Sequence, residues 1–488
     1  MADVLIVGGG PAGMMLAGEL ALAGVEVAIM ERRPTGELAE SRAGGFHCRT
    51  IEVLDQRGIA DRFLAAGKTV QTARFGSTVL DISDFPTRHP YGLGLWQSQM
   101  QPILEDWIKR LGVPVHRGRE VIGFDQDGTG VNVETAEGGT FRTTYLVGAD
   151  GGRSLVRKAA GIEFPGWEAT RSNLIAEVEV SEEPPAGTLL DEAGVHGFSL
   201  LEDGRTYRVI TTERQLGSRT DPDLGDLANS LTAAYGTDFG VHSPTSISRF
   251  TDATRQAATY RKGRVLLVGD AAHVHYPAGG QGIGLGLQDA VNLGWKLAQV
   301  LKGFSPDSLL DTYYAERHPV GLRALKHSMA QTALQRNDAR TAALAETVCE
   351  LMHMDPPRRH LAALIHGLDI AYDFGEGHPL LGRRMPDLDL ETAGGPTRVF
   401  ALLHDAKPVL LNLAESNRLE MAAWTDRVRH VEARFNGSWR LPLLGEVPAP
   451  AAVLVRPDGY VAWVGEGSDE GLDDALTRWF GPGTPAGP

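Results

Sequence analysis

A chain of 488 residues, 42% hydrophobic and 22% charged, has the composition of a globular protein of two or three domains. Its formal net charge of −15 argues against nucleic acid or an anionic membrane surface as a partner. No run of residues reaches the roughly 18 apolar positions of a membrane span. The two cysteines, Cys48 and Cys349, form no C-x-x-C motif, which argues against a redox thiol pair or a structural zinc site. No secretory signal is visible, so we expect a cytoplasmic protein.

The N-terminal residues predict a strand over 3–7, a glycine-rich turn and a helix over 14–23. The turn Gly8-Gly9-Gly10-Pro11-Ala12-Gly13 is a G-x-G-x-x-G pattern, and a second strand over 25–30 ends at Glu31. This context is typical of a dinucleotide-binding turn, in which glycines let the backbone approach a pyrophosphate and the acid accepts hydrogen bonds from a ribose. The alternative is a tight turn followed by a surface acid.

The residues that follow give weaker signals. Arg42 could neutralise a phosphate or support the edge of a flavin, or it could be a solvated loop arginine. Residues 75–97 are expected to leave the nucleotide-binding domain, and a helix is predicted over 103–111. Three runs, 113–115, 120–125 and 130–135, are predicted to form the strands of a small sheet.

Asp150-Gly151 forms a second motif, because it directly follows the apolar run 145–149. An Asp-Gly pair by itself could be only a turn. The basic residues that come next, Arg153, Arg157 and Lys158, favour an anionic ligand nearby.

The third motif begins with an apolar strand, 265–268, and ends with a helix predicted over 287–301. Between them lie Asp270, His273, His275, Pro277 and six glycines. Glycine lets a backbone approach a ligand closely, and the start of a helix presents N–H groups and a positive dipole end. We therefore expect an electron-rich ligand at this helix start.

The remaining segments suggest further domains. Residues 171–261 alternate β-rich runs with loops, as expected for a sheet inserted into the first domain, which would comprise 1–170 and 262–375. A break near 375–385 precedes a small α/β domain over 386–488. The insert is where substrate contacts are expected.

Taken in order, the three motifs closely resemble those of the single-component FAD-dependent aromatic hydroxylases, typified by para-hydroxybenzoate hydroxylase. The likeness covers essentially the whole chain and is closest to the branch that acts on aromatic polyketides of the angucycline, anthracycline and tetracycline types. The resemblance implies an α/β fold: a Rossmann-like FAD-binding domain, an inserted β-sheet substrate domain and a C-terminal thioredoxin-like domain. In that branch the last domain lacks redox cysteines, which matches the cysteine-free segment 386–488.

The resemblance also implies which residues bind FAD. They are Gly8, Gly10, Pro11, Ala12, Gly13, Glu31, Arg32, Arg42, Gln97, Val121, Asp150, Gly151, Asp270, Pro277, Gly280, Gly282, Ile283 and Gly284. The chain departs from the family at Gly284, where relatives commonly have asparagine, so ring positioning or reaction outcome is expected to differ there. The family carries the pattern around His273 without a metal, so neither histidine of this stretch is assigned a catalytic or metal-binding role.

As the resemblance implies, NADPH or NADH would reduce FAD, and a flavin C4a-hydroperoxide would oxygenate a polycyclic aromatic polyketide in antibiotic biosynthesis, with molecular oxygen as co-substrate. Aromatic hydroxylation is the expected reaction. Three alternatives stay open: Baeyer–Villiger oxygen insertion, hydroxylation that inactivates an antibiotic, and a flavin-binding protein without oxygenase activity. A homodimer is possible, and the motifs specify neither the substrate nor the carbon that is oxidised.

Overall fold

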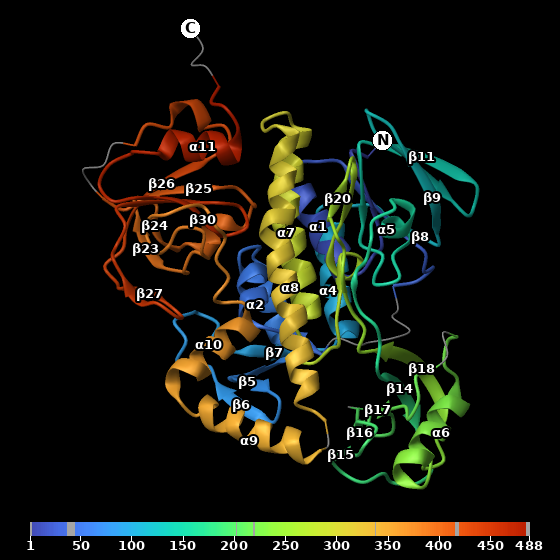
Figure 1. Ribbon diagram of the computed structural model, residues 1–488. Helices are drawn as coiled ribbons and strands as arrows, with labels where there is room; N and C mark the ends of the chain where they lie inside the picture. The colour runs from blue at the N-terminus through green and yellow to red at the C-terminus, as the bar shows by residue number, and fades with distance from the viewer. Residues whose placement is uncertain are drawn as a thin grey trace.

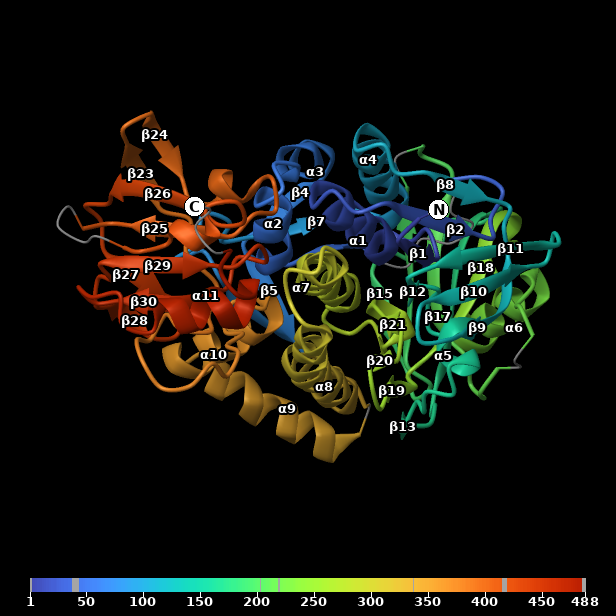
Figure 2. The same cartoon turned by 90° about the horizontal axis from the view of Figure 1, so that it is seen from above.

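Two long helices, α7 (Gly282–Leu301) and α8 (Asp311–Ala333), run through the middle of this mixed α/β protein. A computed structural model describes residues 2–36, 44–201, 203–217, 220–336, 338–414 and 419–484. The sheets formed within residues 115–267, together with the first two strands of the chain, lie on one side of these helices, and the C-terminal sheet lies on the other (Figures 1 and 2). Within the described ranges, none of the helices combines the length and the apolar character that a membrane span requires.

The main sheet has six strands. Their order is β20 (Arg261–Lys262), β21 (Val265–Leu267), β12 (Tyr145–Gly148), β1 (Val4–Val7), β2 (Val27–Glu31) and β8 (Val115–Arg117). All neighbours pair in parallel except β20 with β21. Helices α1 (Pro11–Leu22), α4 (Gln97–Arg110) and α7 lie on one side. On the other side lie α5 (Leu155–Ala159) and a sheet of β9 (Val121–Gln126), β10 (Val131–Thr135) and β11 (Gly139–Thr143). Cover on both faces explains why the inner strands are apolar throughout.

Three expectations from the sequence need correction here. The run 113–115 does not join the small sheet, because β8 pairs with β2 at the edge of the main sheet. Helix α4 begins at Gln97, since Pro102 lies inside the helix and does not end it. Helix α7 begins at Gly282, because its first-turn glycines are tolerated where helices pack closely.

The region 171–261 contains an antiparallel sheet, here called the insert sheet. Its order is β15 (Thr188–Leu190), β16 (Val195–Leu200), β17 (Tyr207–Thr212), β14 (Ser172–Glu179) and β18 (His242–Thr251). Helix α6 (Leu224–Tyr235) packs on one face through Leu227 and Leu231. Both views place α6 on the outside of the molecule (Figures 1 and 2). Strands β13 (Gly166–Trp167), β19 (Thr254–Gln256) and β22 (His273–Val274) form a three-stranded sheet next to it.

A further layer combines early and late parts of the chain. Helices α2 (Cys48–Asp55) and α3 (Ala60–Ala66) precede the hairpin β5 (Thr72–Phe75)–β6 (Thr78–Asp81). Strands β3 (Gly45–Phe46), β4 (Lys68–Val70) and β7 (Gly92–Gly94) form a small sheet. The hairpin shares an apolar core with α9 (Ala339–Met352) and α10 (Asp355–His366), in which Phe75 packs with Ile365. Residues 72–81 therefore lie outside the main sheet.

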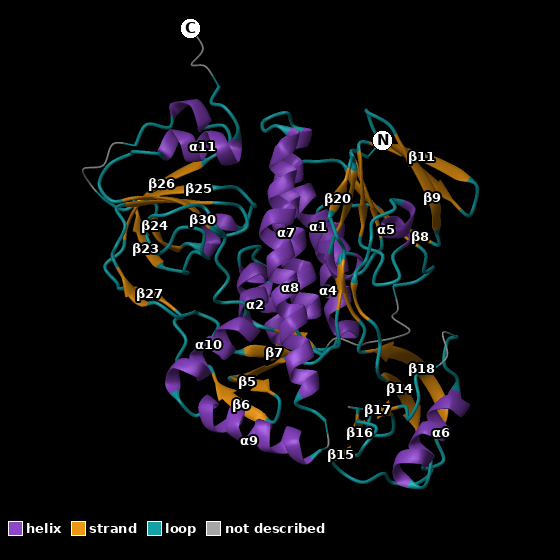
Figure 3. Cartoon of the chain, in the orientation of Figure 1, coloured by secondary structure: helices purple, strands orange, loops and turns teal. Residues whose placement is uncertain are grey.

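The C-terminal residues form their own sheet (Figure 3). Its order is β24 (Gly395–Arg398), β23 (Asp389–Thr392), β26 (Arg429–Arg434), β25 (Val409–Asn412), β29 (Ala452–Val455) and β30 (Val461–Gly465), with a separate hairpin β27 (Trp439–Leu441)–β28 (Gly445–Val447). Only β25 and β26 run parallel. Helix α11 (Leu472–Phe480) places Trp479 and Phe480 in one core with Trp295 of α7. The C-terminal sheet is thus fixed to the central helices by apolar packing.

Candidate functional site

The strand register brings the three sequence motifs to one edge of the main sheet. Val7 of β1 pairs with Gly148 of β12 and with Met30 of β2, and Gly148 also pairs with Leu267 of β21. The turns after these parallel strands therefore leave the sheet side by side at its carboxyl edge, where ligands bind in open α/β sheets.

The glycine-rich turn after β1 has two glycines that the fold requires and one that faces open space. Gly8 has a φ of +111°, and a Cβ there would lie 2.3 Å from the Ala149 carbonyl oxygen. A Cβ on Gly13 would lie 2.2 Å from the Gly8 carbonyl oxygen. A Cβ on Gly10, the N-cap of α1, would meet no atom within 4 Å. The open space at Gly10, at a helix start without a side-chain cap, fits the approach of a pyrophosphate.

Glu31 is fixed at the end of β2 by hydrogen bonds to both of its carboxylate oxygens. The Gly9 N–H donates to Oε2 at 2.7 Å, and the Arg33 N–H and Nε donate to Oε1 at 2.8 and 3.1 Å. Burial alone would raise the pKa of Glu31, but these hydrogen bonds outweigh it and lower the pKa. Arg32 is exposed, so Arg33 is the arginine that orients the acid.

Asp270 lies in a short 3-10 helix, Gly269–Ala271, directly after β21. Gly269 has a φ of +62°, and a Cβ there would lie 3.1 Å from the Cβ of Ala12 and 3.5 Å from the Cα of Gly286. The starts of α1 and α7 thus pack closely around this turn. Asp270 itself is exposed at the same sheet edge as the glycine-rich turn.

Asp150 and the basic residue Arg157 make contacts within the protein. The Ser154 hydroxyl donates to Asp150 Oδ1 at 2.5 Å, so the acid helps to cap α5. Arg157 is buried and donates to the carbonyl oxygens of Ala271 at 2.8 Å and Gly152 at 2.9 Å. Arg157 thus ties two motif turns together, and an anionic ligand near the basic run stays a prediction.

The remaining predicted positions are spread along the site. Gln97 is half-buried at the first residue of α4, while the Val121 side chain packs in the hydrophobic core. Gly151, with a φ of +78°, has open space where a Cβ would lie. Pro11 occupies the first turn of α1, and Ile283 is half-buried in α7. Arg42 lies outside the described residues.

The loop before α7 is held from the α2 side. His47 Nε2 lies 2.6 Å from the Gly279 carbonyl oxygen, and the Gly280 N–H donates to the Pro277 oxygen at 3.0 Å. Pro277 and Gly280 are exposed. The Tyr276 ring lies 5.8 Å from the ring of Phe250 in β18, so the loop contacts the insert sheet.

Histidines around this loop are held in their neutral form. Burial lowers the pKa of His47, His275 and His366, and it lowers that of His327 to about 4 with help from nearby His47 and Arg323. Sequence reasoning missed three of these four positions, since the residues come from distant parts of the chain.

Acid is therefore expected to destabilise the protein through His327. Since its folded-state pKa lies below the unfolded value of 6.5, the folded protein binds fewer protons between pH 6.5 and 4, and stability falls as the pH drops through that window. Between pH 6.5 and 5, the free energy of unfolding of His327→Gln should therefore fall by about 2 kcal/mol less than that of the parent protein. Urea unfolding at several pH values measures this. Identical pH profiles for the variant and the parent would contradict it.

Gly284, where the family resemblance predicts asparagine, is buried against α2. A Cβ there would lie 2.5 Å from Thr50 Oγ1, which also lies 3.4 Å from Gln288 Nε2. A side chain at this position would thus meet α2.

Gly284→Asn is expected to cost about 1–3 kcal/mol through overpacking. The double variant Gly284→Asn/Thr50→Ala should recover most of that loss, because it removes the group that the new side chain meets. Unfolding free energies of the four proteins in this double-mutant cycle give the coupling. Additive effects of the two substitutions would show that the predicted clash does not occur.

His273 belongs to a buried ion-pair chain. Its Nε2 lies 2.6 Å from Asp289 Oδ2, and Arg317 Nε donates to Asp289 Oδ1 at 2.7 Å. Burial would raise the pKa of Asp289, but Arg317 and His273 lower it. In the part of the chain that the structure describes, no group of three histidine, cysteine or acidic side chains could hold a metal. His273 thus links the Asp270 turn to α7 and α8.

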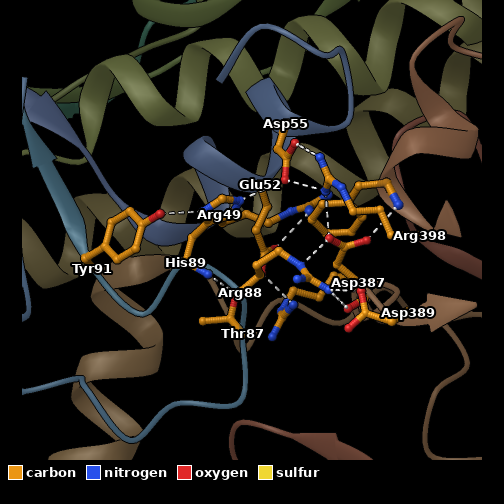
Figure 4. A network of polar contacts seen from close by, with 12 residues as sticks. Arg49, Glu52, Asp55, Thr87, Arg88, His89, Tyr91, Asp387, Asp389 and Arg398 are labelled. Atoms are coloured by element: carbon orange, nitrogen blue, oxygen red, sulfur yellow. Dashed lines mark hydrogen bonds and ion pairs between the residues drawn. The ribbon is translucent and has the colours of Figure 1, made fainter. Parts of the chain in front are cut away.

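Helix α2 is held by ion pairs from later segments (Figure 4). Glu52 accepts hydrogen bonds from Thr87 at 2.6 Å and Arg384 at 2.7 Å. Asp55 lies 2.6 Å from an Arg398 nitrogen and 2.9 Å from His89 Nε2. Burial would raise the pKa of Asp55, and these partners lower it. The C-terminal segment therefore positions the helix that faces Gly284.

Comparison with protein families shows to which family the chain belongs. Residues 1–328 match the FAD binding domain family, and residues 378–483 match the family described as aromatic-ring hydroxylase, C-terminal. The chain belongs to the FAD-binding aromatic-ring hydroxylases. It is a flavoprotein monooxygenase, as its relatives are.

Relatives match over the full length of this hydroxylase. It is 42% identical to the rifampicin monooxygenase of Streptomyces venezuelae, covering 99% of this chain and 100% of that protein. The OxyS anhydrotetracycline hydroxylase from Streptomyces rimosus is 41% identical, with a TM-score of 0.91 over 99% of this chain and 100% of that structure. CabE, an aromatic hydroxylase from angucycline biosynthesis, is 42% identical, with a TM-score of 0.90 over 99% of both chains.

Proposed function

We propose that this monooxygenase hydroxylates an aromatic ring of a polycyclic polyketide, with FAD, molecular oxygen and NADPH or NADH. The observation that carries the proposal is the open space at Gly10, at the sheet edge where the three motif turns meet. Full-length relatives that act on rifampicin and anhydrotetracycline support the substrate class.

The residues divide the task as follows. Gly10 and the start of α1 receive the pyrophosphate, Glu31 accepts hydrogen bonds from the adenosine ribose, and Asp270 faces the ribityl chain. The start of α7 at Gly282 directs backbone N–H groups and a positive dipole end at the flavin ring. FAD bound there would supply the redox chemistry between a nicotinamide reductant and oxygen. Gln97, at the start of α4, would complete the FAD contacts. For Arg42, which lies outside the described residues, FAD binding rests on the family resemblance alone.

The insert sheet serves as the roof of the reaction site. Its contact with the loop before α7, through Phe250 and Tyr276, supports this role. A roof excludes water, which would otherwise consume the activated oxygen without product.

The domain assignment is part of the same proposal. We assign 1–170 and 262–375 to a Rossmann-like FAD-binding domain, 171–261 to the substrate domain and 386–488 to a thioredoxin-like domain. The parallel pair β25–β26, continued by antiparallel β29 and β30 and by α11, supports the last assignment. The antiparallel edge formed by β23 and β24 is a local addition to that pattern.

Purified protein should be yellow and should oxidise NADPH faster when a suitable polyphenol is added. Turnover under ¹⁸O₂ with a panel of polycyclic polyketides, followed by mass spectrometry, tests the reaction. One labelled oxygen atom on an aromatic carbon is expected. Insertion of the label next to a ketone would indicate Baeyer–Villiger chemistry, and products without label would refute oxygenation.

A further inference from the structure

Helix α9 turns one face toward its own chain and the other toward solvent. Val348 and Met352 pack into the apolar core that α9 shares with α10 and the hairpin β5–β6. Both views place α9 along the outer edge of the molecule (Figures 1 and 2). The second face of α9 is therefore open to contact with another molecule.

This open face carries large apolar side chains. Leu344 is 56% exposed and Leu351 is 45% exposed, and Thr347 between them is exposed as well. Because an α-helix has 3.6 residues per turn, spacings of three and four residues place the three side chains in one stripe. An apolar stripe that does not face the core of its own chain is typical of a surface that packs against a second helix.

The two ends of the stripe carry opposite charges. Arg340 extends the stripe one turn before Leu344 and is exposed, and Glu350 is exposed beside Leu351. Within the part of the chain that the structure describes, neither of these two charged side chains has a polar partner. The open face is therefore positive near the start of α9 and negative near its end.

Such a face is complementary to a second copy of itself that lies antiparallel. Leu344 then faces Thr347 of the other copy, and Arg340 packs on Leu351 of the other copy with its guanidinium beside that copy's Glu350. Two-fold symmetry repeats each contact, so the stripe is covered without any further partner. In a parallel pair the two copies of Arg340 would instead repel each other.

We propose that α9 is the interface of a homodimer, in which the stripe Arg340, Leu344, Thr347 and Leu351 packs antiparallel against the same stripe of a second copy of this chain. One helix from each copy makes a small interface. We therefore expect a dissociation constant on the order of 10 µM.

The dimer contact would also support the FAD site. Helix α10 follows α9 and accepts two hydrogen bonds from Gln281, the residue before α7. The Gln281 Nε2 donates to the carbonyl oxygens of Leu364 at 3.2 Å and Ile365 at 3.1 Å. A second copy packed on α9 would thus brace the helix that holds the loop before α7.

Sedimentation velocity of the FAD-loaded enzyme tests the proposal at protein concentrations from about 1 to 100 µM. The wild type should change from monomer to dimer over this range. Leu344→Glu should stay monomeric throughout, because it places a carboxylate in the middle of the stripe. Leu216→Glu is the matched control, since Leu216 of the insert is 54% exposed, and it should dimerise as the wild type does. Flavin content and urea unfolding show that each variant is folded.

Charge reversal tests the antiparallel arrangement. Arg340→Glu and Glu350→Arg should each raise the dissociation constant about tenfold or more, because each brings like charges together at two symmetry-related places. The two substitutions combined in one chain should restore dimerisation to within about threefold of the wild type.

Three results would overturn the inference: a wild type that stays monomeric at every concentration, dimerisation of Leu344→Glu as strong as that of Leu216→Glu, or a double charge reversal as weak as the single ones. Sedimentation needs neither substrate nor turnover, so the result is independent of the ¹⁸O₂ experiment.

Discussion

Gly10→Ala is expected to remove FAD from the enzyme while leaving the fold intact. Gly10 has a φ of −85°, which alanine adopts readily, and its Cβ would meet no protein atom within 4 Å. The new methyl group would instead occupy the space proposed for the pyrophosphate. We expect at least a 100-fold loss of FAD affinity, about 3 kcal/mol. Flavin absorbance after gel filtration and urea unfolding of the apoprotein measure the two effects separately.

Gly13→Ala is the informative comparison for this experiment. Its Cβ would lie 2.2 Å from the Gly8 carbonyl oxygen, so α1 would have to move relative to β1. This variant should lose FAD and also unfold at lower urea concentration. If Gly10→Ala kept a full complement of FAD, the cofactor would not approach the backbone there, and the proposed role of the glycine-rich turn would be wrong.

Local signals in the sequence predicted the nucleotide-binding part of the fold well. The strands β1 and β2 and the helix α1 each depend on a short run of residues, and the glycine pattern specifies the turn between them. Where local signals conflicted with packing, prediction failed: Pro102 suggested a late start for α4, and the glycines near Gly282 suggested a late start for α7. Both helices start early because neighbouring elements support their first turns.

Contacts between distant residues could not be predicted in this way. The sequence places Glu31 at a strand end, but it does not show that Arg33 would orient the carboxylate. The sequence does not show that Arg157 bridges two backbone turns, because one of its partners, Ala271, lies more than 100 positions away. A buried donor such as Arg208 Nη1, which has no acceptor among the described residues, becomes visible only when every neighbour is in place.

The interface with the C-terminal segment is the largest feature that the sequence does not reveal. It contains buried ion pairs as well as apolar packing, and the charges come from elements that are far apart in the chain. Arg57 of the α2–α3 turn pairs with Glu19 of α1 and donates to the carbonyl oxygens of Leu403 and Pro457. Such charges require partners on both sides, so the FAD site and the C-terminal sheet depend on each other for stability.

Arg456→Met is expected to destabilise the protein by about 3–5 kcal/mol, because it leaves buried charges without their main partner. Arg456 is fully buried and donates to both carboxylate oxygens of Glu316 at 2.8 and 2.7 Å and to Asp458 at 2.5 Å. Among the described residues, Lys296 at 3.0 Å would still form an ion pair with Glu316, and Asn292 would still donate to it at 2.6 Å. Urea unfolding followed by tryptophan fluorescence measures the loss.

The pH dependence distinguishes a lost charge pair from lost packing. Burial would raise the pKa of Glu316, but Arg456 and Lys296 lower it to about 2, below its usual value of 4.5. Its contribution to stability is therefore fully present above about pH 4.5 and is lost as the pH falls toward 2. In Arg456→Met the pKa of Glu316 should rise, so the difference from wild type should shrink below pH 4.5.

An exposed ion pair serves as the control for the stability loss expected in Arg456→Met. Arg110 lies 2.8 Å from Asp106 and is 68% exposed, so Arg110→Met should cost at most about 1 kcal/mol. Combining Arg456→Met with Glu316→Gln should recover part of the loss, because the amide needs no counter-charge. A cost for Arg456→Met as small as that of the surface control would mean that water enters the interface and compensates Glu316. The C-terminal sheet would then be docked by apolar contacts around Trp479 alone.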